Sequence, residues 1–345
     1  MQNKNFKRKK VQLPSLNELS NGILQGNLTA LSRGITLCES NVPNDRKLAS
    51  QLVNKCLPHS GNSLRIGITG VPGVGKSTFI ESFGIFLIEK QKKKVAVLAV
   101  DPSSNKSKGS ILGDKTRMEA LSTHSQAFIR PSPSSGSLGG VAHHSRESII
   151  LCEAAGFDTI IVETVGVGQS EIEVKEMTDF FLLLMLAGAG DELQGIKRGI
   201  MEMADGILIN KADGDNLTAA QIAKREYQNA LHLFPAADSG WSPKVGVCSA
   251  IEKVNIDLAW KMLDSYFTHA KSNNFFEQQR KAQLQSWFIK SIEELLNQSL
   301  FDSDSLRSLI NQLKSEVESK KKSPNQAAQE VFEKYIKEIS KSANK

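Results

Sequence analysis

The chain has 345 residues, of which 40% are hydrophobic and 23% charged, and its 43 Lys and Arg against 37 Asp and Glu give a formal net charge of +6. This composition is typical of globular proteins and excludes a disordered, fibrous or collagen-like chain. The basic excess lies at the ends, because residues 1–10 hold five basic and no acidic residues, residues 314–345 hold eight and five, and residues 11–313 are slightly acidic. A basic groove for nucleic acid across the body is therefore not indicated.

The cysteines and the apolar runs indicate the compartment. Cys38, Cys56, Cys152 and Cys248 are widely spaced and form no CxxC pair. This pattern favours reduced thiols and argues against a disulfide framework or a zinc finger. The longest apolar run, which starts at Phe180, is too short to span a bilayer, and no apolar stretch follows the basic N-terminus as in a secretory signal. We expect a cytoplasmic protein without membrane or nucleic-acid partners.

In chain order, the sequence pattern changes twice. Residues 11–60 are polar with Leu and Ile at roughly helical spacing, which predicts two or three short helices. From residue 64, short runs rich in Ile, Val and Leu alternate with helical segments, which predicts an α/β fold with a parallel sheet and right-handed crossovers. The predicted strands are 64–69, 95–100, 159–162, 181–186, 206–209 and 245–247.

After about residue 255 the strand signals stop. Apolar stripes over 284–296 and 306–317, and a third after Pro324, predict two or three amphipathic helices. These helices could pack on the sheet of their own chain or form a dimerisation arm, and the residues alone leave both interpretations open.

The phosphate-binding signature is the strongest motif of the chain. Residues 70–77, GVPGVGKS, fit G-x-x-x-x-G-K-[ST] between a predicted strand and a helical segment at 78–89. The glycines allow backbone N–H groups to surround a phosphate, and the start of the helix adds its dipole. Lys76 would reach the β- and γ-phosphates and Ser77 would bind Mg²⁺. The predicted phosphate-binding residues are Gly70, Val71, Pro72, Gly73, Val74, Gly75, Lys76, Ser77 and Thr78.

A second motif identifies the base as guanine. Asn210-Lys211-Ala212-Asp213 follows the predicted strand 206–209. The Asp213 carboxylate can accept hydrogen bonds from N1–H and the exocyclic amino group of guanine, whereas adenine would leave it unpaired. The Lys211 stem would cover the base, Asn210 would tie the loops together, and the backbone at Ser249 and Ala250 would face the guanine carbonyl. GTP and GDP are therefore the predicted ligands.

Carboxylates follow two other strands. Asp101 and Glu163 end the second and third predicted strands, where carboxylates would face Mg²⁺, although an Asp before Pro is also a common turn residue. Gly166 would offer its N–H to the γ-phosphate. Asp114 lies in a Gly- and Ser-rich loop that is a candidate switch segment. Ser77, Asp101, Asp114 and Glu163 form the candidate metal set.

Two further polar segments are open to an ordinary structural interpretation. Asp191, Gln194 and Lys197 recur three residues apart in a Gly-rich loop after the most apolar strand, so a short helix would present them on one side. The same loop could be a plain strand-to-helix connection. His143, His144 and Glu147 lie close together, but this spacing favours packing over a metal site.

With these motifs, the sequence resembles the MeaB/ArgK family of P-loop GTPases, which includes the human MMAA-type proteins. The strings that carry the resemblance, between residues 64 and 250, are GITGVPGVGKST (67–78), AVDPSS (99–104), GDKTRM (113–118), VETVGVGQSE (162–171), AGDELQGIKRGIME (189–202) and NKAD (210–213).

The resemblance implies a P-loop NTPase sheet flanked by helices, with a helical extension at 1–60, a GTPase domain at 61–270 and a dimerisation arm at 271–345. It implies a homodimeric GTPase that acts as a chaperone of adenosylcobalamin-dependent methylmalonyl-CoA mutase, gating cofactor loading and protecting the mutase from inactivation. In this comparison the catalytic residues are Lys76, Asp101, Asp114, Glu163, Asp191, Gln194 and Lys197, of which the last three form a switch that becomes competent when the mutase docks. No general base is assigned.

Three alternatives remain. A metallochaperone GTPase shares the architecture but usually needs Cys and His ligands near the switch loops, where Cys152, His143 and His144 have an unconvincing spacing. A protein kinase acting on transport proteins is disfavoured because N-K-x-D argues against ATP. An RNA- or membrane-bound GTPase is supported by the basic ends alone.

Overall fold

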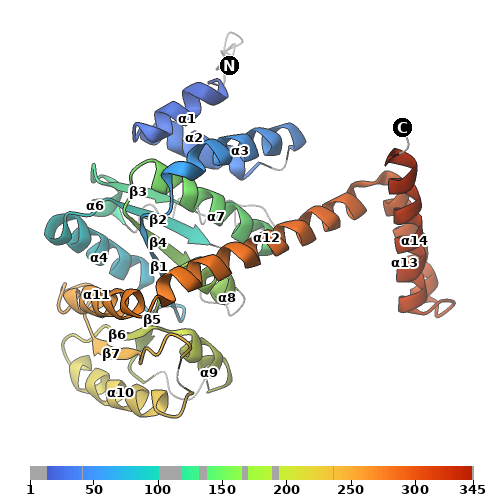
Figure 1. Ribbon diagram of the computed structural model, residues 1–345. Coiled ribbons are helices and arrows are strands. Elements are labelled where there is room, and N and C mark those ends of the chain that lie inside the picture. The colour runs from blue at the N-terminus through green and yellow to red at the C-terminus, as the bar shows by residue number, and fades with distance from the viewer. Residues whose placement is uncertain are drawn as a thin grey trace, which may run out of the picture. The chain divides into compact units, whose positions relative to one another are not determined.

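The computed structural model describes residues 14–40, 42–100, 118–131, 138–164, 170–188, 194–235 and 237–343 (Figure 1). The chain divides into two compact units, residues 1–281 and 282–345. In the described part, no helix is long and apolar enough to cross a membrane.

The first unit is built on a parallel sheet. Seven strands among the described residues pair in the order β3-β2-β4-β1-β5-β6-β7, and every pairing is parallel. The predicted fold class is confirmed. The sequence pattern missed β3, because its four residues alternate between buried and half-buried positions and form no apolar run. The strands are β1 (Leu64–Gly70), β2 (Val95–Val100), β3 (Ala127–Arg130), β4 (Thr159–Thr164), β5 (Phe180–Leu186), β6 (Gly206–Asn210) and β7 (Lys244–Val247).

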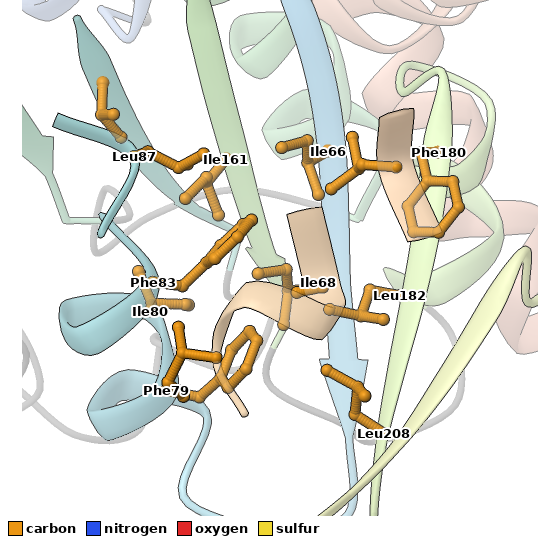
Figure 2. Close-up of a cluster of buried hydrophobic side chains, with 14 of the residues drawn as sticks. Ile66, Ile68, Phe79, Ile80, Phe83, Leu87, Ile161, Phe180, Leu182 and Leu208 are labelled. Atoms are coloured by element: carbon orange, nitrogen blue, oxygen red, sulfur yellow. The ribbon is translucent and has the colours of Figure 1, made fainter. Parts of the chain in front are cut away.

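Helices cover both faces of the sheet. Phe79 and Phe83 on α4 pack on Ile66 and Ile68 of β1, and α11 completes this side of the core (Figure 2). The other face holds alternate side chains of the same strands, such as Leu183, against α9 and α10. Strands buried on both faces explain the continuous apolar runs in the sequence. The helices are α4 (Lys76–Gln91), α6 (Glu119–Ser122), α7 (Leu138–Ala154), α8 (Ser170–Lys175), α9 (Gln194–Met203), α10 (Asn216–Leu231) and α11 (Asp257–Ser272).

Three helices precede the sheet: α1 (Leu16–Leu24), α2 (Leu28–Cys38) and α3 (Pro43–Cys56), followed by a short 3-10 turn, Leu57–His59. Ser15 and Glu18 form a reciprocal capping box at the start of α1, and Asn27 caps α2. The three helices pack on one another and on α7. This segment therefore belongs to the same compact unit as the sheet.

Ion pairs fix the amino ends of the strands. Arg280, in the first turns of α12 (Phe275–Asp302), donates two hydrogen bonds of 2.8 Å to Asp179, whose side chain is fully buried at the start of β5. Arg65 of β1 pairs at 2.9 Å with Glu153. Burial alone would raise the pKa of Glu153, but Arg65, Ser63 and the Gly61 N–H outweigh it and lower that pKa.

A third pair joins Lys175, the last residue of α8, to Asp205 just before β6. Asp205 also accepts a 2.8 Å hydrogen bond from the Phe181 N–H. Burial nevertheless raises the pKa of Asp205, because Lys175 offsets the loss of solvation only in part.

All four cysteines are buried and reduced. Burial raises the pKa of every one of these thiols, to about 11 for Cys56 and about 12 for Cys248.

The second unit comprises the rest of α12 with α13 (Asp304–Glu318) and α14 (Pro324–Ala343). Leu306 and Leu313 of α13 and Tyr335 of α14 are buried in its small core, and the Tyr335 hydroxyl donates to Ser299 Oγ at 3.0 Å. Many large apolar side chains remain exposed on this unit. They are Leu284, Phe288, Ile289, Ile292, Leu295, Leu296, Phe301, Phe332, Ile336 and Ile339.

Candidate functional site

The phosphate loop lies at the carboxyl end of β1. Residues 71–75 connect Gly70 to the first residue of α4, Lys76. Gly75 precedes the helix in a left-handed conformation, with φ +88°, and a Cβ at this position would lie 3.1 Å from Asn210 Nδ2. Both the backbone angle and the close neighbour therefore require glycine. The loop thus brings backbone N–H groups to the start of a helix, as phosphate binding needs.

Lys76 and Ser77 lie in the first turn of α4. The Lys76 ammonium donates to Gly70 O at 2.8 Å, and Ser77 Oγ donates to Glu163 Oε1 at 3.4 Å. Burial lowers the pKa of Lys76, while the charges of Glu163 and Glu171 oppose that shift. The hydroxyl of Ser77 beside the largely buried carboxylate of Glu163 forms a set of hard oxygen donors, which fits Mg²⁺.

Asn210 joins the candidate base loop to the phosphate loop. Its Nδ2 donates to Val74 O at 2.8 Å, and its Oδ1 accepts from the Ala250 N–H at 3.1 Å. Ser82 of α4 donates to Ala250 O at 2.8 Å, so the segment after β7 is fixed to the same helix. The Ala250 N–H that we predicted to face guanine is thus part of the frame that orients Asn210.

Asp213 is held at the rim of this frame. Ser249 Oγ donates to Asp213 Oδ2 at 2.5 Å. Lys211 adopts a left-handed backbone, with φ +58°, and Asn216 Nδ2 donates to its carbonyl at 2.6 Å. These contacts hold the N-K-x-D loop in one conformation, with the two predicted base-reading segments in contact through Ser249 and Asp213.

The structure brings together the predicted residues of four segments. Residues 70–78, Glu163, 210–213 and 249–250 meet at the carboxyl ends of β1, β4, β6 and β7. Gln194 and Lys197 lie in the first two turns of α9, but their side chains are outside the described set. Asp101, Asp114, Gly166 and Asp191 also lie outside the described residues.

Glu171 of α8 was not predicted as a functional residue. It is completely buried, its Oε1 accepts from Thr69 Oγ1 at 3.4 Å, and Thr69 Oγ1 in turn accepts from Thr164 Oγ1 at 2.8 Å. Its Oε2 has no hydrogen-bond partner within the described segments. Leaving a buried carboxylate oxygen unpaired costs more than about 1–3 kcal/mol. In sequence, Glu171 was visible only as the last letter of VETVGVGQSE.

In the histidine motif, the side chain of His143 lies outside the described set. His144 Nδ1 lies 3.7 Å from Glu147 Oε2, one turn away on α7. No group of three or more His, Cys, Asp or Glu that could hold a metal occurs among the residues that the structure describes.

Comparisons with known proteins agree with this geometry. The family model described as "Methylmalonyl Co-A mutase-associated GTPase MeaB" matches residues 31–305. The chain is 47% identical over 309 residues to "GTPase ArgK" of Escherichia coli, covering 90% of this chain and 93% of the relative. It is 42% identical over 323 residues to the mouse protein described as "Methylmalonic aciduria type A homolog, mitochondrial", covering 91% and 78%. A crystal structure described as "LAO/AO transport system kinase" superposes with a TM-score of 0.73 at 40% identity, covering 93% and 99%.

Proposed function

Since the chain belongs to the MeaB family of methylmalonyl-CoA mutase-associated GTPases, we propose that it binds GTP and hydrolyses it to GDP and phosphate. The observation that carries this proposal is the Asn210 side chain, which bonds the phosphate loop through Val74 and the segment after β7 through Ala250. One residue thereby sets the distance between the predicted phosphate and guanine subsites.

The reaction would use positioning and charge. Water would attack the γ-phosphorus in line with the departing GDP oxygen, and the charge on the phosphate oxygens would be stabilised by the loop N–H groups and Lys76. Ser77 and Glu163 would hold Mg²⁺ together with Asp101 and Asp114. When bound, this ion neutralises charge on the β- and γ-phosphates. Lys76 is partly desolvated, so its charge is weakly screened toward a phosphate.

Guanine selectivity would come from Asp213. Ser249 fixes one carboxylate oxygen at 2.5 Å, which orients the carboxylate before a base arrives. Guanine would supply two N–H donors to it, and the aliphatic part of Lys211 would cover the base. Adenine would leave a desolvated carboxylate without donors, which discriminates strongly against ATP.

For the partner, we propose an adenosylcobalamin-dependent acyl-CoA mutase, with methylmalonyl-CoA mutase as the first candidate. The support is the family description and the description of the mouse relative. GTP turnover would gate cofactor loading and protect the mutase from inactivation. As the family resemblance implies, Asp191, Gln194 and Lys197 would form the switch that the mutase completes on docking.

A homodimer is proposed as well, with residues 1–60 as a helical extension, 61–270 as the GTPase domain and 271–345 as the dimerisation arm. The support is the number of large apolar side chains exposed on α12 and α14, among them Phe288 at 64% and Leu295 at 65% exposed. An apolar surface of this kind marks a protein interface. Light scattering of the wild-type protein and of the variant Phe288→Asp tests the dimer. We expect the wild type to be dimeric and Phe288→Asp to dissociate more readily. Gln285→Asp changes an exposed polar position of the same helix and is the matched control, which should remain dimeric.

The function is tested by nucleotide turnover of the purified protein with GTP and with ATP, each with and without purified methylmalonyl-CoA mutase loaded with adenosylcobalamin. We expect GTP hydrolysis that the mutase accelerates, and a stable complex in gel filtration. GTP turnover without acceleration or complex would remove the mutase and leave the GTPase. Phosphate transfer from ATP to a protein acceptor would contradict both the GTPase activity and the mutase partner, and would favour the protein kinase alternative.

A further inference from the structure

The buried carboxyl group of Glu171 lies on the first turn of α8, a helix that contacts β1 and β4 of the candidate nucleotide site. A chain of hydroxyls reaches it: Thr164 Oγ1 donates to Thr69 Oγ1 at 2.8 Å, and Thr69 Oγ1 donates to Glu171 Oε1 at 3.4 Å. Thr69 directly precedes the phosphate loop, and Thr164 directly follows Glu163. Glu171 is thus connected to the two strand ends that carry the predicted phosphate-binding and metal-binding residues.

Its environment differs from that of three other buried carboxylates of the unit. Glu153, Asp179 and Asp205 each form an ion pair with Arg65, Arg280 and Lys175, respectively. For Glu171 the described segments supply a hydroxyl donor to Oε1 and none to Oε2, although the residue is 0% exposed. Folding alone does not favour such an arrangement, because burying a polar atom without a hydrogen-bond partner is unfavourable. A buried carboxyl group with an unpaired oxygen next to a candidate site points to a role in that site.

The two strand ends that Glu171 supports lead directly into the site. Thr69 is followed by Gly70, whose carbonyl oxygen accepts the 2.8 Å hydrogen bond of the Lys76 ammonium. Thr164 is preceded by Glu163, whose Oε1 accepts from Ser77 Oγ at 3.4 Å. Glu171 therefore supports, through two hydroxyls, the ends of β1 and β4 that carry these contacts.

We propose that Glu171 is a positioning residue for GTP hydrolysis, holding Thr69 and Thr164 so that the phosphate loop and Glu163 keep their relative placement. The inference rests on the proposed GTPase activity. It assigns Glu171 no contact with nucleotide. Loss of the carboxylate should lower the rate of the chemical step more than the affinity for GTP, because small displacements of positioned groups affect the transition state most.

The experiment compares steady-state GTP turnover of wild type, Glu171→Gln and the control Glu173→Gln. Glu173 lies on the same helix and faces Arg146 at 4.0 Å, away from the hydroxyl chain. We expect Glu171→Gln to lower kcat about 10-fold with KM for GTP within about 3-fold of wild type, and Glu173→Gln to leave both near wild type. Gln keeps one acceptor for Thr69 but replaces the second carboxylate oxygen with an amide NH₂ group, so this result would show that the carboxylate itself is needed to hold the hydroxyl chain.

A second pair of variants covers the case in which Glu171→Gln fails to fold. Thr69→Val removes the hydroxyl that joins Thr164 to Glu171 and should lower kcat, while Thr69→Ser keeps it and should restore turnover. Unchanged kcat in Glu171→Gln or Thr69→Val, or an equal loss in Glu173→Gln, would overturn the inference while the GTPase stands. Absence of GTP turnover by wild type would overturn the proposed function and the inference together.

Discussion

The two ends of the central strands treat buried charge in opposite ways. At the amino end, Arg280 and Arg65 satisfy the carboxylates of Asp179 and Glu153 with short, multiple hydrogen bonds. At the carboxyl end, Lys76 donates to a carbonyl oxygen and Glu171 accepts from a hydroxyl. We infer that the amino end stabilises the fold, whereas the proposed site at the carboxyl end would keep its polar groups available to a ligand. Substitutions at the two ends should therefore separate stability from activity.

The largest expected effect is on activity, at the carboxyl end. Lys76→Ala should lower kcat for GTP about 10³-fold, or about 4 kcal/mol, because the transition state loses a preorganised cation. The free energy of unfolding should stay near wild type or rise, since Lys76 is desolvated without a carboxylate hydrogen bond among its described contacts. Turnover assays and urea unfolding measure the two quantities. A strong loss of stability would break the comparison.

Next in size is the reverse effect at the amino end. Arg280→Ala leaves Asp179 buried without its cation and should lower the free energy of unfolding by about 3–5 kcal/mol. The activity per folded molecule should stay near wild type, because Arg280 contacts the opposite end of the sheet. Urea unfolding combined with active-site titration checks both. A large fall in kcat of the folded fraction would contradict the division between the ends.

A smaller effect concerns the base. Asp213→Asn should weaken GTP binding about 100-fold, because an amide offers one acceptor and a donor that faces the exocyclic amino group of guanine. Xanthosine triphosphate carries an oxygen at that position, so the variant should bind it better than wild type does. Competition binding with the two nucleotides makes the measurement. A uniform loss for both would indicate that Asp213 holds the loop rather than reads the base.

The smallest effect is a pH dependence at the amino end. The pKa of Glu153 is lower in the folded protein than its ordinary value of about 4.5. Its carboxylate therefore stabilises the fold fully above about pH 4.5, and this contribution is lost as pH falls through the folded pKa. Glu153→Gln should cost about 2 kcal/mol at pH 7 and approach the stability of wild type in acid.

Urea unfolding of both proteins between pH 7 and pH 3 tests this. Asp205, whose raised pKa gives the opposite sign, is present in both and cancels in the difference. A constant difference at every pH would show that Glu153 acts by packing and not by charge.

Much of this organisation could be predicted from the sequence because it rests on local patterns. Strands buried on both faces give continuous apolar runs, and the phosphate and N-K-x-D loops need particular residues at fixed spacing. The parallel sheet was confirmed for this reason. The strand β3 could not be found, since its edge position leaves Phe128 and Arg130 half-buried.

Features that depend on distant residues were not predictable. Arg280 meets Asp179 across 101 positions, and Glu171 meets Thr69 across 102. No local pattern records such pairs, because Arg280 and Glu171 each resemble an ordinary charge on a helix surface. The hydrogen bond from the Ala250 N–H to Asn210 Oδ1 was equally unpredictable, since it depends on how β6 and β7 lie in the sheet.

The four thiols have a practical consequence for experiments. Thiolates, not thiols, react with maleimides and disulfides, and every native cysteine is buried with a raised pKa. The native chain should therefore be nearly inert to labelling near neutral pH. A cysteine introduced at Leu233, which is 83% exposed, would then be a single addressable position. Fluorophores could be attached there without first removing any native residue.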